Sequence, residues 1–213
     1  MKLHLNTVSD LLWDSLRKLM ILKESDSFRI VGGTSLSLQL GHRESIDIDL
    51  FTDSEYGSID FAQLENILIE TFPYVDKSSI GTVGMGTSYF IGNNKKELVK
   101  LDLFYTDPFV FPSIIEQNVR FSSMEEIAAM KLEVIAQGGR KKDFWDIHEL
   151  LNTYTLNDLI GFYIKRYPYG SSKKELLSQI INFSEAEDDF IPNCFKDKDW
   201  EIIKLDLEEW IKK

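Results

Sequence analysis

The segment 46–51, with the sequence IDIDLF, restricts the possible folds of this chain more than any other segment. Aliphatic residues alternate with aspartate in it, and successive side chains of a strand point to opposite faces of a sheet. The alternation therefore predicts a strand that presents Asp47 and Asp49 on one face. The other face is expected to point into the core and consists of Ile46, Ile48 and Leu50.

The chain before residue 120 mixes helical and strand patterns. Apolar spacing or composition predicts helices over the segments 8–24, 34–40 and 58–72. Short apolar or alternating runs predict a strand at 28–31, a pair of strands within 79–91 and a strand at 98–105. We therefore expect residues 1–120 to form a mixed α/β domain.

The chain after residue 120 has helical composition throughout. Ser122 and Ser123 each precede a glutamate by three residues, a spacing typical of a helix start, and Gly138-Gly139 is a common stop signal. Further helices are expected over the segments 142–152, 156–166, 173–183 and 200–213. We therefore predict a helical domain over residues 121–213, packed against the first domain.

Composition excludes several classes of protein. The net charge of −11 argues against a protein that coats nucleic acid through a broad basic face. No apolar run approaches the roughly 20 residues of a membrane span, and the first ten residues lack the apolar core of a signal peptide. A cytoplasmic protein without membrane contact is therefore expected. One cysteine, Cys194, and three histidines give little basis for a disulfide or soft-metal site.

Three aspartates are candidate catalytic residues and metal ligands. Asp47 and Asp49 share one strand face, and Asp102 projects from the predicted strand 98–105. Carboxylate oxygens are suitable ligands for Mg²⁺, which neutralises phosphate charge in nucleotidyl transfer. The alternative is that these acids are solvent-facing residues of a half-exposed sheet.

The sequence Gly32-Gly33-Thr34-Ser35 lies between a predicted strand and a predicted helix. Glycine permits close backbone approach, and the free amides at a helix start, with the two hydroxyls, suit the phosphates of a nucleotide. A structural break is the alternative interpretation of such a turn. The order of strand, turn, helix and acid-bearing strand predicts that the turn and the acid pair meet at one edge of the sheet.

Lys131 occupies an unusual position on the helix that is expected to begin near Ser123. The solvent side of this helix is expected to contain Glu125, Ala129 and Glu133. Lys131 points to the apolar side, together with Ile127, Val134 and Ile135. A buried ammonium is costly unless it meets a carboxylate or phosphate, so Lys131 is a candidate site residue; a lysine that reaches past the core edge to solvent is the alternative.

Basic residues also precede Asp143. Arg140, Lys141 and Lys142 form a short run that could contact phosphates, and Asp146 lies one helical turn after Asp143. The alternative is a solvated loop with an ordinary pair between Lys142 and Asp146.

Several of these segments resemble one known family. The segments 31–36, 43–51, 101–104, 130–132 and 140–147, within roughly residues 28–150, are similar to motifs of the AbiEii/AbiGii-type nucleotidyltransferase toxins. These toxins belong to bacterial toxin–antitoxin and abortive-infection systems. The resemblance implies an α/β (α+β) fold: the mixed sheet with flanking helices of the DNA polymerase β superfamily, followed by a C-terminal helical bundle.

The resemblance also implies residue roles and partners. Asp47 and Asp49 would bind metal, Gly32 to Ser35 would hold the phosphates, and Lys131 and Asp143 would assist near the triphosphate. The implied reaction transfers a nucleotide from a nucleoside triphosphate to the acceptor end of transfer RNA, with a cognate antitoxin as protein partner. Transfer to a protein hydroxyl, and a non-catalytic module that binds a nucleotide or a partner, are the alternatives.

Overall fold

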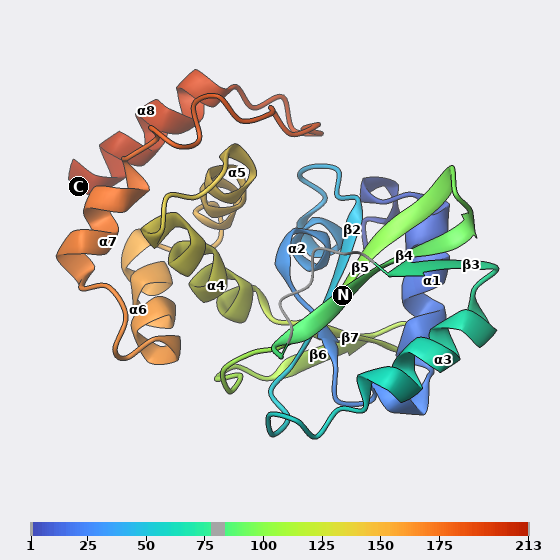
Figure 1. Ribbon diagram of the computed structural model, residues 1–213. Coiled ribbons are helices and arrows are strands. Elements are labelled where there is room, and N and C mark those ends of the chain that lie inside the picture. The colour runs from blue at the N-terminus through green and yellow to red at the C-terminus, as the bar shows by residue number, and fades with distance from the viewer. Residues whose placement is uncertain (1, 78–83, 213) are drawn as a thin grey trace.

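The acid-bearing strand lies at the centre of a seven-stranded sheet in the computed structural model, which describes residues 2–77 and 84–212 (Figure 1). The order of the strands across the sheet is β3-β4-β5-β2-β1-β7-β6. Their bounds are β1 Arg29–Ile30, β2 Asp47–Thr52, β3 Tyr74–Lys77, β4 Gly86–Asn94, β5 Glu97–Tyr105, β6 Ser113–Glu116 and β7 Val119–Ser122. Because β2 pairs parallel with β5 and antiparallel with β1, the sheet is mixed, as predicted.

The alternation in β2 is confirmed over most of its length. Ile48 and Leu50 are fully buried, whereas Asp47 and Asp49 are partly exposed on the other face. The prediction for Ile46 is wrong, since this side chain is 68% exposed. The strand begins only at Asp47, so Ile46 belongs to the connection before it and does not follow the strand's alternation.

Two helices cover the sheet face to which Ile48 and Leu50 point. α1 (Asp10–Met20) and α3 (Phe61–Thr71) fall within their predicted segments but are shorter, and both lie on the same side of the sheet in Figure 1. Their apolar residues form one hydrophobic cluster with the inner face of the sheet. Two short 3-10 helices, Leu5–Thr7 and Lys23–Ser25, flank α1.

The helical half has a second hydrophobic cluster. Its helices are α4 Met124–Ala136, α5 Lys141–Leu150, α6 Leu156–Arg166, α7 Lys173–Ile180 and α8 Trp200–Lys212. Trp145 of α5 stacks on Trp200 of α8 with ring centroids 6.0 Å apart. α2 (Gly32–Leu40) lies between the halves, because Leu38 belongs to the first cluster and Leu36 to the second. Because there are two clusters, we propose two domains, residues 1–120 and 121–213. Strand β7 crosses the boundary between them.

Two segments differ from the prediction. The sequence predicts a pair of strands within 79–91, but β4 pairs with β3, which lies before this segment. Residues 79–83 of the predicted pair lie outside the described residues. The hairpin of β6 and β7 was not predicted. Its two-residue turn, Gln117 and Asn118, has φ angles of 49° and 64°, and it lacks the glycine that usually marks such a turn.

In the helical half, Ser123 and not Ser122 caps α4. Ala129 is fully buried and Val134 is 42% exposed, so both were assigned to the wrong face of this helix. The reason is that α4 packs against α2, α5, α6 and α7, which leaves it only a narrow solvent stripe. Within the described residues, no helix combines the length and apolar character required to cross a bilayer.

A fully buried ion pair joins α6 to α4. Arg166 Nη1 contacts Glu126 Oε1, and the same guanidinium donates hydrogen bonds to Thr106 Oγ1, at 2.9 Å, and to the carbonyl of Pro108, at 3.1 Å. Glu126 in turn accepts from the backbone amides of Val110 and Phe111. The pair therefore ties the helical half to the chain that leaves β5.

We predict that Arg166→Met lowers the free energy of unfolding by about 3–5 kcal/mol, because it leaves the Glu126 carboxylate buried without its cation. Chemical denaturation measures the change. Lys77→Met is the matched control: it breaks the exposed Lys77–Glu65 pair and should cost less than about 1 kcal/mol. Equal losses in the two variants would contradict the prediction.

Candidate active site

The glycine turn and the acid pair meet at one edge of the sheet, as the sequence predicted. The amide of Val31 donates to the carbonyl of Asp49 at 2.9 Å, which sets the end of β1 beside Asp49. A Cβ atom on Gly32 would stand 2.7 Å from Asp49 Oδ2, and Gly32 has a φ of +65°. Only glycine suits this position, because a side chain would strain the backbone and displace the carboxylate.

The glycines form the first turn of α2, so this helix begins two residues earlier than predicted. A Cβ atom on Gly33 would stand 2.4 Å from Arg43 Nη2, so Gly33 makes room for a guanidinium. Thr34 and Ser35 are buried, and their hydroxyls bond within the protein. Thr34 Oγ1 contacts Ser45 Oγ and the carbonyl of Asp47, and Ser35 Oγ accepts from the Gln39 amide.

Asp49 and Asp102 are direct neighbours across the parallel pair β2 and β5. Removal from water, and then the charges of Asp102 and Asp47, raise the pKa of Asp49 to about 6, although Lys131 and Lys142 act in the opposite direction. The nearby acids therefore add to the effect of burial on Asp49.

Asp102 already has a cationic partner. Its Oδ2 lies 2.6 Å from Lys100 Nζ, and its Oδ1 accepts from Ser88 Oγ at 2.5 Å. Within the described residues, no three acidic, histidine or cysteine side chains are arranged to hold a metal ion. The donor chemistry at Asp47 and Asp49 nevertheless fits Mg²⁺, because both supply carboxylate oxygens, which this cation prefers.

Lys131 forms ion pairs with carboxylates. The alternative interpretation, in which its side chain reaches past the core edge to solvent, is therefore wrong. Its Nζ lies 2.5 Å from Asp143 Oδ1 and 2.7 Å from Asp146 Oδ2, and the residue is only 6% exposed. Asp146 also accepts two hydrogen bonds from Arg43, at 2.7 and 2.8 Å, and its Oδ1 lies 2.8 Å from His42 Nε2. The buried network of these five residues joins α4, α5 and the connection between α2 and β2.

The two acids and two bases of the network are held in their charged forms, and His42 is the exception. Burial alone would raise the pKa of Asp146, but Arg43 and Lys131, with hydrogen bonds from His42 and Arg43, hold it well below its usual range. Burial lowers the pKa of His42, which favours the neutral ring. The pairing of Arg43 with Asp146 was not predicted, because no local pattern links residues so far apart in the sequence.

The three basic residues before Asp143 have separate roles. Lys141 is buried and donates to the carbonyls of Glu187 and Asp189, at 2.7 and 2.9 Å. Lys142 forms no ion pair with Asp146, and burial followed by nearby cations lowers its pKa. Among the described residues, the Lys142 ammonium has no hydrogen-bond or ion-pair partner, so it remains able to contact an anion.

Two adjoining hollows border the acids. One, of about 180 Å³, is lined by Gly32, Gly33, Asp49, Lys131 and Asp143, among others. The other, of about 370 Å³, is lined by Asp47, Ser45, Ile46 and the segment 189–193, among others. Arg140 and Lys142 line both, so a basic wall is common to the two hollows.

Two solved structures that share this architecture are described as nucleotidyltransferases. The chain resembles a candidate nucleotidyltransferase from Helicobacter pylori with a TM-score of 0.58 and 18% identity, covering 93% of this chain and 91% of that one. It also resembles MenT4, a nucleotidyltransferase toxin from Mycobacterium tuberculosis, with a TM-score of 0.57 and 13% identity, covering 95% of this chain and 83% of that one. These similarities establish a nucleotidyltransferase fold.

The family is established by sequence. Residues 14–209 match the model of the nucleotidyl transferase AbiEii toxin family of type IV toxin–antitoxin systems. The chain therefore belongs to this family and is a nucleotidyltransferase. It is also 27% identical to an uncharacterised protein of Aquifex aeolicus over 159 residues, which cover 72% of this chain and 73% of that protein.

We predict that Asp49→Asn stabilises the metal-free protein at neutral pH. The pKa of Asp49 rises from 3.8 to about 6 on folding. The free energy of unfolding that Asp49 contributes is therefore highest below pH 3.8 and falls as the pH rises from 3.8 to about 6. Above about pH 6, the ionised carboxylate lowers the free energy of unfolding by up to about 3 kcal/mol, and a neutral amide at this position would avoid that loss.

Urea denaturation at several pH values, without divalent cations, measures this effect. The gain in Asp49→Asn should be present at about pH 8 and absent near pH 4. Asp14→Asn, at an exposed site on α1, is the matched control and should show no such dependence. A variant that is less stable than the parent at about pH 8 would contradict the prediction.

Proposed function

We propose that this enzyme transfers a nucleotide from a nucleoside triphosphate to transfer RNA, with Mg²⁺ as its metal cofactor. The observation that carries the proposal is the contact between the turn and the acids. Asp49 lies against Gly32 and directly beside Asp102. A triphosphate bound at the start of α2 would therefore bring its phosphates to the carboxylates.

The residues in and around the two hollows would have distinct roles. Asp47 and Asp49 would be metal ligands, and Asp102 would join them on release from Lys100. The backbone of Gly32 to Ser35 would bind phosphates, since the hydroxyls of Thr34 and Ser35 are already bonded within the protein. Lys131, oriented by Asp143, would add positive charge beside the triphosphate. Bound Mg²⁺ would neutralise the phosphates and the pyrophosphate leaving group.

The transfer step itself exchanges one bond for another. A hydroxyl oxygen of the acceptor bonds to the α-phosphorus, and the bond from that phosphorus to the bridging oxygen breaks, so that pyrophosphate leaves. The hydroxyl proton needs a nearby base, and Asp102 is the proposed acceptor because it lies beside Asp49. We place this reaction in the cytoplasm, where transfer RNA is available, with a cognate antitoxin as protein partner.

A transfer assay tests the proposal. Purified protein, incubated with each labelled nucleoside triphosphate, Mg²⁺ and total transfer RNA, should label the RNA. Asp47→Ala should reduce the labelling by at least about 100-fold, because the remaining carboxylates cannot hold the metal in the same geometry. Asp14→Ala, on the exposed face of α1, should leave it unchanged.

Other outcomes separate the alternatives. Label on protein and not on RNA would favour a protein hydroxyl as the acceptor. Triphosphate binding in calorimetry that needs no Mg²⁺ and gives no transfer would favour a non-catalytic module. Equal labelling by Asp47→Ala would refute the assignment of the acid pair.

We also predict that chelation of divalent cations abolishes labelling and that added Mg²⁺ restores it. The reason is that the proposed ligands are carboxylate oxygens, which suit a hard cation. Isothermal titration of the metal-free protein with Mg²⁺ alone gives an independent readout, in which Asp47→Ala should bind less tightly. Full activity in excess chelator would contradict the metal requirement.

A further inference from the structure

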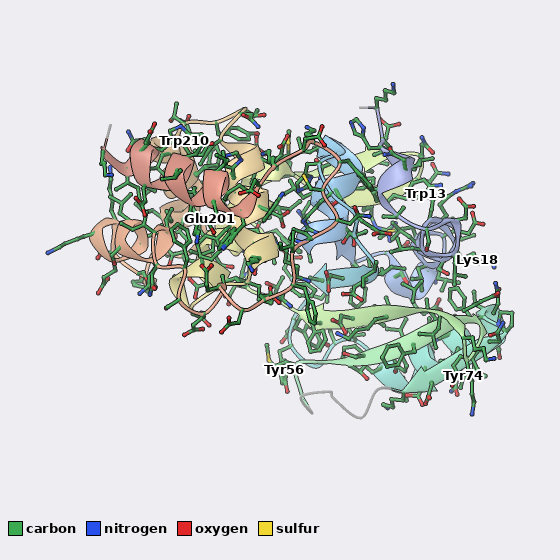
Figure 2. The ribbon with its side chains drawn as sticks, turned by 90° about the horizontal axis from the view of Figure 1, so that it is seen from above. Trp13, Lys18, Tyr56, Tyr74, Glu201 and Trp210 are labelled. Atoms are coloured by element: carbon green, nitrogen blue, oxygen red, sulfur yellow. The ribbon has the colours of Figure 1, made fainter. Side chains whose placement is uncertain are left out.

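The segment 187–195 extends from the helical half to the connection between α2 and β2 (Figure 2). Lys141 Nζ donates hydrogen bonds to the carbonyls of Glu187 and Asp189. The backbone amide of Lys141 donates to Asp189 Oδ2 at 3.2 Å. At the other end, the amide of Glu44 donates to the Asn193 carbonyl at 2.9 Å. The segment is thus fixed on both sides of residues 190–192.

Between these anchors the chain exposes apolar side chains. Phe190 is 92% exposed and Ile191 is 67% exposed, and both line the larger hollow. Ile46, 68% exposed, lines the same hollow next to Asp47. An exposed aromatic side chain on this anchored segment adds little to the core, but it offers a flat apolar surface to a ligand.

The larger hollow contains a cation that can contact an anionic ligand. Arg140 and Lys142 line it, and Lys142 has no partner among the described residues. Two acids outside the proposed metal site also line it: Glu44 accepts a hydrogen bond from the Asn193 side chain at 3.0 Å, and Asp189 accepts one from the Lys141 backbone amide. Both donors are neutral, so the two carboxylates keep their charge. An unpaired cation and an exposed ring therefore face the same space.

We propose that this hollow receives the unpaired end of an RNA acceptor and that Phe190 stacks on one of its bases. Nucleobases stack on exposed aromatic rings in single-stranded RNA sites, while basic side chains follow the phosphates. This inference rests on the proposed function, because the proposed function places the triphosphate in the smaller hollow and leaves the larger one for the acceptor. The acceptor hydroxyl would then reach the acids from the larger hollow, which Asp47 lines. The α-phosphate would reach them from the smaller hollow, which Asp49 lines.

Phe190 is the suitable residue for a test, because Arg140 and Lys142 border both hollows. We expect Phe190→Ala to raise the KM for transfer RNA roughly 10-fold or more, from the loss of one stacked base, and to leave the KM for the triphosphate within about twofold. Phe190→Trp should restore the parent KM for RNA. Tyr169→Ala removes another fully exposed aromatic ring, which lines neither hollow, and should behave as the parent.

A binding measurement separates this inference from the proposed reaction. Fluorescence anisotropy with a labelled single-stranded oligoribonucleotide should show weaker binding to Phe190→Ala than to the parent, Phe190→Trp or Tyr169→Ala. If the parent labels RNA but Phe190→Ala keeps both the parent KM and the parent affinity, the inference is wrong and the proposed function stands. If the parent labels protein and not RNA, the proposed acceptor fails and the inference fails with it.

Discussion

One buried carboxylate links the helical half to the chain that enters the centre of the sheet. Asp146 of α5 binds Arg43, from the connection before β2, and Lys131, from α4. Asp143 balances the second cation, so two acids and two bases are enclosed with no excess charge. Loss of one member would leave a charge buried and unpaired, which is far more costly than loss of an exposed pair. The network therefore fixes these elements where apolar packing alone would allow small shifts.

The same network limits which cations can pair with the acids on β2. Because Asp146 binds Arg43 by two hydrogen bonds, this guanidinium is not available to the acids on β2, although it lies against Gly33 close to them. Asp49 therefore has no ion-pair partner among the described residues. Burial, followed by the charges of Asp102 and Asp47, raises its pKa. A carboxylate with a raised pKa destabilises the folded protein at a pH where it is ionised, and perturbed pKa values are common at functional sites. The protein is thus less stable than it could be at the place where a metal would bind.

Local patterns in the sequence predicted the parts of the fold that local physics determines. Alternation identified β2 and its acid face, and the order of the turn and β2 predicted that Gly32 and Asp49 meet. The hairpin at residues 113–122 was missed because its turn adopts positive φ angles at Gln117 and Asn118, without glycine. The sequence showed that Lys131 needed an anion but could not identify Asp143 and Asp146 as its partners, since that choice depends on how α4 packs against α5.

Lys141 shows how a basic motif can serve the site without contacting substrate. In the sequence it belongs to a run that suits phosphates, yet its ammonium is buried and holds two carbonyls of the segment 187–195. Only its neighbours Arg140 and Lys142 line the hollows. Because that segment supplies one wall of the larger hollow, the sheet alone cannot form both hollows. The helical half therefore contributes twice to the candidate site, through the network at Asp146 and through the wall that contains Phe190.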